Sequence, residues 1–356
     1  MTTRSAPSAS TMREVAARAG VSVATVSRVA NGNYPVSAAT KERVRAAMQE
    51  LGYVLDDNAR ALAGTGSRLI VLVLNELVDP FYGYIARGVQ QEAAANGRAC
   101  LVIATSGQPG GEDEAIDLAI GRRADMVILV GGSRVDDAYQ RTIRRHHRRL
   151  ADHGIRLVLC GRPTTDRGEV PSVQYENEAG AFMVTDHLLR RGHRRILYLG
   201  GPTGLSTTEA RVNGYRRALR EHDLAPDDAL IRIGQFGREW SRRTMLETLD
   251  AELEVTAVFA GNDICAAGVY AALKQRGLRI PDDVSVVGYD DVPLAVDLDP
   301  PLTTVNVPLE PLGREAVRLG LMGDGASADP FARDRSQARL GVYLVERDSV
   351  SSPAPA

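Results

Sequence analysis

Short apolar runs alternate with longer amphipathic stretches over most of this 356-residue chain, and this alternation constrains the fold more than any other feature. Strands separated by helices of about ten to fifteen residues form parallel sheets that carry helices on both faces. We therefore expect an α/β core. The runs that predict strands are residues 69–74, 99–104, 126–130, 157–160, 195–199, 257–260 and 284–288, and the main helical patterns are 81–96, 177–191, 206–221 and 263–276.

This alternating region is too long for one sheet, because single hydrophobic cores stop growing beyond about 250–300 residues. We expect two doubly wound parallel-sheet lobes that separate near residues 163–172, a stretch rich in Thr, Gly, Pro and charge. Ligands of such sheets bind at the carboxyl ends of the strands, so a site is expected between the lobes. The predicted divisions are 67–171 for lobe 1 with a return segment at about 305–330, 172–304 for lobe 2 with a final strand within about 335–350, and disordered tails at 1–10 and 351–356.

The first fifty residues show three short helical patterns with clear start and stop signals. Thr11 and Glu14 have the spacing of a capping box, in which each side chain bonds the backbone of the other residue. Gly20 is placed to end the first helix in the left-handed conformation, and Ser22 is placed to cap the second. This pattern predicts a small all-α helix-turn-helix domain over residues 11–55.

Charge is distributed unevenly along the chain. The whole sequence has 43 basic and 45 acidic residues, a net charge of −2. Residues 1–50 hold seven basic and three acidic residues, so this segment carries +4. A small domain with excess positive charge is typical of phosphate binding, and we expect double-stranded DNA as its partner.

The second helix of this domain is the candidate for reading DNA sequence in the major groove. We expect Val23, Ala24 and Arg28 to face outward and to contact base edges. For Arg28 the alternatives remain open, because its guanidinium can bind guanine or a phosphate. The candidates for phosphate contacts are Ser22, Thr25, Ser27 and Asn31.

Several motifs together point to one known family. In the amino-terminal part they are VAxxAGVSxxTVSRVxN from Val15, VSxxTxxxV from Val36 and LGY from Leu51. Further motifs are DPFY at 79–82, GHRRI at 192–196, NDxxAxG at 262–268, DVSVVGYDD at 283–291 and PLTTV at 301–305. The chain resembles LacI/GalR family transcriptional regulators over nearly its whole length. The resemblance implies a homodimer whose heads read the halves of a near-palindromic operator, and a periplasmic-binding-protein-like core that senses a small molecule.

Residues 56–66 correspond to the hinge helix and linker of that family. The resemblance implies that Ala59 and Leu62 form the apolar pair of this helix, with Leu62 as the wedge that opens a base step from the minor groove. A helix of eight or nine residues is marginal alone, so we expect it to form only with DNA and its dimer mate. The family usually has Pro-Asn where this chain has Leu55-Asp56, and we interpret the aspartate as a helix cap.

The resemblance also marks candidate effector contacts. An arginine and a carboxylate suit vicinal hydroxyls and an aromatic ring suits a sugar face, so we expect a sugar or sugar derivative as the effector. The same polar residues could merely bond strand ends, and the aromatic ones could merely pack the lobe. Asp79, where relatives usually have Asn, indicates either another effector chemistry or a helix cap. The candidates are Phe81, Tyr82, Arg211, Asn262 and Asp290, with Phe236 or Trp240 as a second aromatic wall.

We find no motif for catalysis, metal binding or a cofactor. The loop 200–204 lacks the lysine of a phosphate loop, and Pro202 removes a backbone donor. His146 and His147 lack a third ligand at metal spacing, so we expect them on a solvated helix face. No GxSxG nucleophile motif occurs. We therefore expect no enzyme activity, no metal and no cofactor.

Cysteine usage and hydropathy favour a cytoplasmic protein with no membrane association. The three cysteines are far apart and form no CxxC motif, which excludes a disulfide framework. The longest apolar run, 69–74, is far shorter than the roughly 20 residues of a membrane helix. Residues 1–10 contain one Arg and no apolar core, so we expect no export signal.

We predict a sequence-specific transcriptional regulator, a repressor that a small-molecule effector releases from its operator. The alternative is a co-repressor-dependent regulator that senses a nucleobase or another metabolite. A solute-binding protein for transport and an α/β enzyme with a fused DNA-binding head are the rival classes. The missing export signal and the helix-turn-helix pattern argue against the first, and the lack of catalytic motifs argues against the second. No leucine heptad follows residue 345, so we expect a dimer.

Overall fold

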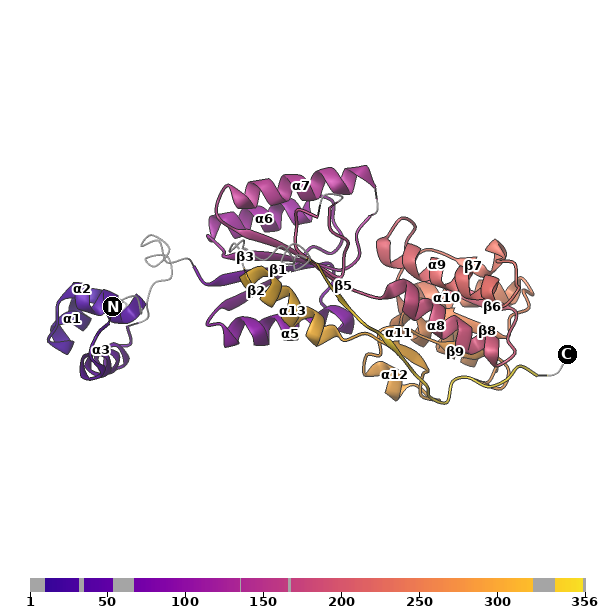
Figure 1. Ribbon diagram of the computed structural model, residues 1–356. Coiled ribbons are helices and arrows are strands. Elements are labelled where there is room, and N and C mark those ends of the chain that lie inside the picture. The colour runs from indigo at the N-terminus through magenta and orange to yellow at the C-terminus, as the bar shows by residue number, and fades with distance from the viewer. Residues whose placement is uncertain are drawn as a thin grey trace, which may run out of the picture. The chain divides into compact units, whose positions relative to one another are not determined.

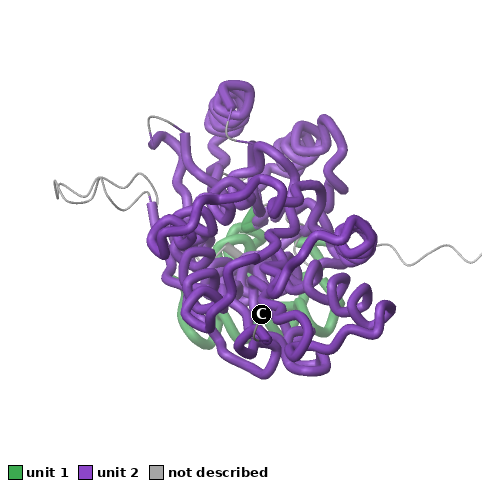
Figure 2. Tube along the Cα trace, turned by 90° about the vertical axis from the view of Figure 1, so that its right-hand side faces the viewer, with its two compact units in different colours: residues 1–68 green, residues 69–356 purple. Residues whose placement is uncertain are grey.

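The computed structural model forms two compact units, residues 1–68 and 69–356, which Figure 2 colours separately. We treat each unit by itself. The predicted hinge segment, with Ala59 and Leu62, lies outside the described residues. The structure describes residues 10–31, 35–53, 67–134, 136–165, 168–322 and 337–354.

The first unit contains the three predicted helices, α1 (Met12–Ala19), α2 (Val23–Asn31) and α3 (Ala38–Glu50). The capping box is confirmed, because the Thr11 side chain accepts the Glu14 N–H while the Glu14 carboxylate accepts the Thr11 N–H. Such a pair satisfies donors that a helix start otherwise leaves unbonded.

The turn and the small core of this unit also follow the predicted pattern. Gly20 ends α1 with φ 63°, a left-handed conformation that glycine adopts without steric cost. Val15, Val26 and Val44 come one from each helix, and all three are fully buried. Their packing fixes the orientation of α2, and with it the face that α2 turns to solvent.

Lobe 1 of the second unit is built on a six-stranded parallel sheet. In spatial order the strands are β11 (Gln337–Leu340), β5 (Ser172–Tyr175), β4 (Arg156–Cys160), β3 (Met126–Val130), β1 (Leu69–Leu74) and β2 (Ala99–Ala104). Helices α6 (Gly111–Gly121) and α7 (Asp137–Ala151) cover one face, and α5 (Pro80–Ala95) and α13 (Leu309–Met322) cover the other (Figure 1).

The alternation of buried side chains along β1 explains why both faces need helices. Ile70 and Leu72 pack on the side of α5 and α13, whereas Val71 and Val73 pack on the side of α6 and α7. A strand buried on both faces reads as one continuous apolar run, which is the signal that the sequence carries at 69–74.

Lobe 2 has a smaller parallel sheet in the order β7 (Ile231–Arg232), β6 (Ile196–Leu199), β8 (Ala257–Ala260) and β9 (Ser285–Val287). Helices α8 (Asn177–Arg190) and α9 (Ser206–Glu221) pack together on one face, and α10 (Arg238–Asp250) and α11 (Asp263–Gln275) on the other. The two lobes and the all-α head confirm the predicted fold class. A 3₁₀ turn (Asp228–Leu230) and the short helix α12 (Leu294–Asp297) complete the lobe.

Two predicted lobe boundaries need correction. Residue 172 was expected to begin lobe 2, but β5 pairs with β4, so the chain leaves lobe 1 only after Tyr175. The expected final strand of lobe 2 is instead two strands: β11 joins the lobe 1 sheet beside β5, and β12 (Tyr343–Val345) pairs antiparallel with β10 (Thr304–Asn306). These strands are short and only partly apolar, so they lack the continuous signal of a central strand.

The predicted tail at 351–356 also needs correction at its start. The Ser351 N–H donates to Ser285 Oγ at 3.1 Å, and the Ser351 carbonyl lies 2.9 Å from Nε2 of the buried His193. The chain is therefore tied to lobe 2 through residue 351. A serine-rich composition gave no sign of these bonds, because they form only with residues distant in sequence.

The position of His146 also differs from the one predicted. It was expected on a solvated face, but its side chain is 0% exposed. Ile143, His146 and Leu150 follow helical spacing and form the buried face of α7. Burial lowers the pKa of His146 and favours its neutral form.

In the described part of the chain, no helix combines the length and the apolar character that a bilayer span requires.

Candidate functional site

Helix α2 presents the predicted base-reading residues to solvent. Val23 is 43% exposed, and Ala24 and Arg28 are exposed as well. Val26, on the opposite face of the helix, is fully buried. The arrangement leaves one side of α2 available to insert into a groove of DNA, as a recognition helix does.

The residues predicted to contact phosphates lie along the same helix. Ser22 is exposed, and its Oγ accepts the Thr25 N–H at 3.2 Å, which caps the start of α2. Thr25 and Ser27 are half-buried, and Asn31 is the last residue of α2. A capped helix start with hydroxyl groups beside it is a common phosphate contact.

A buried arginine organises the strand ends of the second unit. Arg211 projects from α9 and is 2% exposed. Its Nε donates to Asn177 Oδ1 at 3.0 Å, and its Nη1 donates to the Gly261 carbonyl. Its Nη2 lies 3.2 Å from Asp290 Oδ1 and 3.3 Å from the Tyr175 hydroxyl. We call Arg211 and these bonded partners, with Tyr289, the Arg211 cluster.

The aromatic ring of Tyr289 closes one face of the guanidinium. Its centroid lies 3.7 Å from Arg211 Cζ, within the range of a cation–π contact. Burial raises the pKa of Tyr289, so its hydroxyl stays protonated, and that hydroxyl donates to the Glu176 carbonyl at 3.2 Å. Tyr289 thereby holds the guanidinium in one plane.

Asp290 carries the negative charge of the cluster in an unusual backbone conformation. Its φ is 105°, and its N–H donates to the Val305 carbonyl at 2.9 Å. A non-glycine residue in this region is strained, and such strain is often found at functional sites. Burial raises the pKa of Asp290 to about 7, while the charge of Arg211 opposes the shift.

One atom of the Asn262 side chain serves as a helix cap. Its Oδ1 accepts the Cys265 N–H at 2.9 Å and caps α11, so this oxygen serves the helix start. The neighbouring Asp263 is fully buried and accepts bonds from the Val292 N–H and the Thr304 hydroxyl. Burial raises the pKa of Asp263 well above its ordinary range. Asp263 thus ties the start of α11 to the chain after β9.

The lobe 1 candidates lie at the start of α5. Phe81 is buried, and its ring meets Tyr82 edge-on at 5.2 Å and Tyr175 at 6.3 Å. Asp79 has the cap role that the sequence left open, because its Oδ1 accepts the Phe81 N–H at 2.9 Å. Burial raises the pKa of Asp79 and the charge of Arg211 lowers it, so this carboxylate also lies within the field of the Arg211 cluster.

Of the two alternative aromatic walls, the structure brings Phe236 beside the arginine. The Phe236 ring centroid is 5.8 Å from Arg211 Cζ. Trp240 instead packs over Gly234, where an added Cβ would meet the indole at 2.2 Å.

Sequence reasoning missed Tyr175, Asn177 and Tyr289, although each contacts Arg211. Tyr175 ends the unpredicted strand β5, and Asn177 follows it at the start of α8. Tyr289 directly precedes the predicted Asp290. A general signal was present, since all three lie at carboxyl ends of strands, but their shared target could not be read from spacing.

Hydrogen bonds also join lobe 1 directly to lobe 2. The Ser206 N–H donates to the Ser133 carbonyl at 2.8 Å, and the Ser133 N–H donates to Ser206 Oγ at 3.2 Å. The adjacent Arg134 and Leu205 form an antiparallel bridge. We call these contacts the interlobe bridge. They join the end of β3 in lobe 1 to the start of α9, the helix that carries Arg211.

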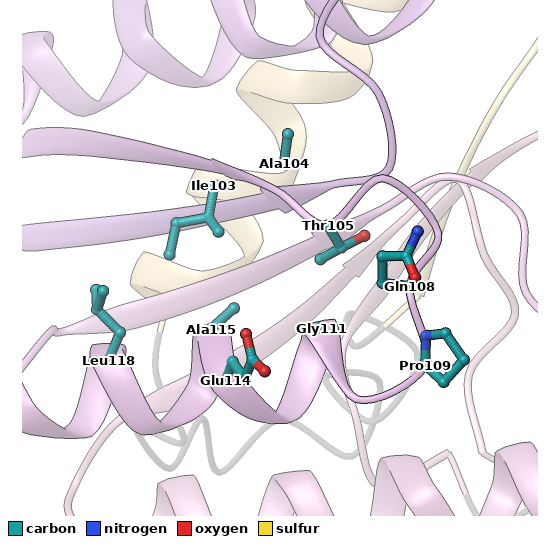
Figure 3. A pocket seen from close by; sticks show the side chains of 9 residues that line it. All are labelled: Ile103, Ala104, Thr105, Gln108, Pro109, Gly111, Glu114, Ala115 and Leu118. Atoms are coloured by element: carbon teal, nitrogen blue, oxygen red, sulfur yellow. The ribbon is translucent and has the colours of Figure 1, made fainter.

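A separate pocket of about 270 Å³ lies in lobe 1 between the end of β2 and α6 (Figure 3). Thr105, Gln108 and Glu114 supply its polar groups, and Leu118 and Ala115 are among its apolar ones. It contains no residue of the Arg211 cluster and no aromatic ring that could stack on a sugar. We therefore place the candidate effector site at the Arg211 cluster.

Two family models match the chain. Residues 11–56 match the model described as bacterial regulatory proteins, lacI family, and residues 185–350 match the periplasmic binding protein-like domain. These ranges contain α2 and the lobe 2 part of the Arg211 cluster, respectively.

Known proteins are similar over most of the chain. The transcriptional regulator CelR of Thermobifida fusca is 36% identical over 87% of this chain and 90% of its own length. The transcriptional repressor CytR of Escherichia coli K12 is 33% identical over 87% of this chain and 89% of its own length.

Solved structures show the same similarity. A complex of the regulator CelR with cellobiose has a TM-score of 0.70 at 32% identity, covering 96% of this chain and 99% of that chain. A lac repressor dimer bound to operator and the anti-inducer ONPF has a TM-score of 0.79 at 26% identity, with the same shares covered.

Proposed function

We propose that this chain, which belongs to the lacI family of bacterial regulatory proteins, is a transcriptional repressor. In this proposal, a sugar releases the repressor from operator DNA. The Arg211–Asp290 pair at the strand ends carries this proposal. The carboxylate of Asp290 can bind a ligand, and aromatic rings lie beside it. The same pair also bonds parts of the second unit to each other. The chain acts by binding and not by catalysis.

The DNA-binding role is assigned to α2 and the segment that follows the head. Val23, Ala24 and Arg28 read base edges, and the capped helix start contacts phosphates. Leu62 enters the minor groove, with Ala59 as its apolar partner. A relative of this family is a dimer on its operator, and this chain likewise acts as a homodimer in the cytoplasm, where the DNA is.

Effector control follows from population shift between two states of the second unit. A ligand changes the equilibrium only if it binds one state more tightly than the other. A ligand that contacts both Asp79 in lobe 1 and Asp290 in lobe 2 has an affinity that depends on how the two lobes are placed. The interlobe bridge also depends on this placement. By linkage, operator DNA must weaken effector binding by the same factor.

The test starts with duplexes selected from a random pool by the full-length protein. We expect enrichment of a near-palindromic sequence and weaker binding to it in the presence of cellobiose, the sugar bound by a relative. Tighter binding with cellobiose would show a co-repressor, and no preference for any duplex over scrambled DNA would refute the proposal.

A further inference from the structure

We propose that the effector site takes an uncharged, hydroxyl-rich ligand and rejects phosphorylated or carboxylated ones. This inference rests on the proposed function, because it names the chemical class of ligand for that same site. It follows from which charged groups at the strand ends are already bonded within the protein and which are not.

The arginine of the site has little left to offer an anion. A guanidinium binds phosphate or carboxylate most strongly through a pair of parallel N–H groups. In Arg211, Nη1 bonds the Gly261 carbonyl, Nη2 bonds Asp290, and Nε bonds Asn177. Tyr289 covers one guanidinium face. Arg211 therefore positions Asp290 and lacks a free edge for a second anion.

A second buried arginine at the same end of the sheets is also consumed. Arg162 follows β4 and is 6% exposed. Its Nε donates to the Gly131 carbonyl at 3.0 Å, its Nη2 to the Val130 carbonyl at 2.8 Å, and its Nη1 to Glu112 Oε1 at 2.9 Å. This guanidinium ties β3 and β4 to α6.

Lysine cannot take the place of these arginines. The whole chain has two lysines, Lys41 and Lys274. Lys41 belongs to α3 in the other unit, and Lys274 lies in the last turn of α11, the end of the helix remote from Asn262. A site that binds phosphate usually provides Arg or Lys side chains that are free to bond it.

A carboxylate accepts one of the N–H groups of the glycine-rich loop before α9. Helix starts with free N–H groups commonly receive phosphate. Here the Gly204 N–H donates to Glu209 Oε1 at 3.1 Å, and the Gly200 N–H donates to the Arg232 carbonyl at 3.0 Å. Pro202, between them, has no N–H to give. An incoming phosphate would meet the negative charge of Glu209.

The two buried arginines are bonded within the protein, whereas two carboxylates of the site keep free acceptors. Within the described residues, Asp79 and Asp290 each use Oδ1 in a hydrogen bond, to the Phe81 N–H and to Arg211, and each has Oδ2 for a ligand. The charge of Asp79 also acts on Asp290, so the two carboxylates lie in one field. Ionised carboxylates accept hydrogen bonds and repel anions, and hydroxyl groups are the donors of a sugar.

The test compares neutral and anionic members of matched pairs by calorimetry with the full-length protein at constant ionic strength. The pairs are cellobiose and cellobionate, glucose and glucose 6-phosphate, and ribose and ribose 5-phosphate. We expect at least one neutral sugar to bind, and its anionic partner to bind about 100-fold more weakly or not at all, since like charges brought together in an interface are strongly unfavourable.

Either of two results would overturn the inference: an anionic member that binds as tightly as its neutral partner, or no binding by any neutral sugar of the panel. Both are distinct from failure of the proposed function. A phosphorylated sugar that releases the operator would leave that function standing, whereas a neutral sugar that binds without affecting operator affinity would contradict that function alone.

A pair of variants tests the role of the carboxylate itself. Asp79→Asn keeps an oxygen that can cap α5 and removes the charge, so we expect discrimination against the anionic partner to fall about tenfold. The control is Asp227→Asn, which also keeps a cap, that of the 3₁₀ turn at Asp228–Leu230, but lies outside the Arg211 cluster. Equal discrimination in wild type and Asp79→Asn would contradict the assigned role of Asp79.

Discussion

Arg211 in α9 and Asp290 after β9 form a buried ion pair with 3.2 Å between Nη2 and Oδ1, and the two residues are 2% and 5% exposed. Removing two charges from water costs several kcal/mol per ion, so such a pair is weak evidence for stability. Its geometry indicates another use. The pair holds the strained Asp290 backbone and its carboxylate in one position at the strand ends, ready for a ligand.

Breaking this pair from one side should destabilise the second unit strongly. Arg211→Gln leaves the Asp290 carboxylate buried without its partner, and we expect the free energy of unfolding to fall by about 3–5 kcal/mol. The control is Arg217→Gln in the same helix, whose pair with Glu178 is largely exposed and contributes about 0–1 kcal/mol. Urea denaturation of the two variants measures both changes, and similar losses would contradict the central position of Arg211.

Effector affinity should depend on pH through Asp290. Burial raises its pKa to about 7, so the carboxylate is ionised above that pH and protonated below it. Because the ionised form accepts the ligand's hydroxyl bonds, affinity should fall as the pH falls, by roughly tenfold from about pH 8 to about pH 6.

Calorimetry with cellobiose across that range checks this prediction, and Asp290→Asn provides the comparison. The variant should bind more weakly and show a flatter profile, since an amide does not titrate. A wild-type profile that rises toward low pH would have the opposite sign and would exclude an ionised Asp290 as the ligand's acceptor.

The interlobe bridge should contribute to effector binding from outside the ligand contacts. Ser206→Ala removes the oxygen that accepts the Ser133 N–H. A hydrogen bond of this kind contributes about 1 kcal/mol, so cellobiose affinity should fall roughly fivefold. Ser133→Ala is the matched control, because it keeps the Ser133 backbone groups that make both bonds. If the two variants bind cellobiose equally well, the Ser206 side chain does not contribute to effector binding.

Arg28 should determine sequence preference more than overall affinity for DNA. If its guanidinium reads guanine, Arg28→Gln should cost about 1–3 kcal/mol on the selected operator and relax the preference at one position of each half-site. A competition assay over single-base operator variants measures this. The exposed Arg220 in lobe 2 supplies the control, Arg220→Gln, which should leave the profile unchanged. A uniform loss on every sequence would assign Arg28 to a phosphate.

The central strands could be predicted closely because burial on both faces makes their sequence continuously apolar. The expected ranges 69–74 and 126–130 are the bounds of β1 and β3, and 99–104 gives the bounds of β2, an edge strand whose run is also apolar. Strand β5 was not predicted and β11 was assigned to the wrong lobe, since four residues with mixed polarity give little signal and their partners lie far away in sequence. Their position is fixed by the sheet edge that they extend.

The candidate site could likewise be predicted only in part from the sequence. Capping patterns are local, so Thr11, Gly20 and Ser22 could be predicted as the start and end of α1 and the start of α2. The structure brings the predicted Arg211 and Asp290 together, but their meeting with Tyr175, Asn177 and Tyr289 depends on how separate strand ends pack. The buried oxygen of Asn262 that caps α11 could not be distinguished from a ligand contact by spacing alone.

The central claim is that a ligand at the Arg211 cluster controls the DNA affinity of a separate head. The most direct measurement is the operator dissociation constant of the full-length protein, with and without saturating cellobiose, for the wild type and for Asp290→Asn. We predict that cellobiose weakens operator binding of the wild type by about 5–150-fold, the usual range of allosteric coupling, and leaves the variant unaffected. An operator affinity that cellobiose does not change, or one that changes equally in the variant, would contradict the account.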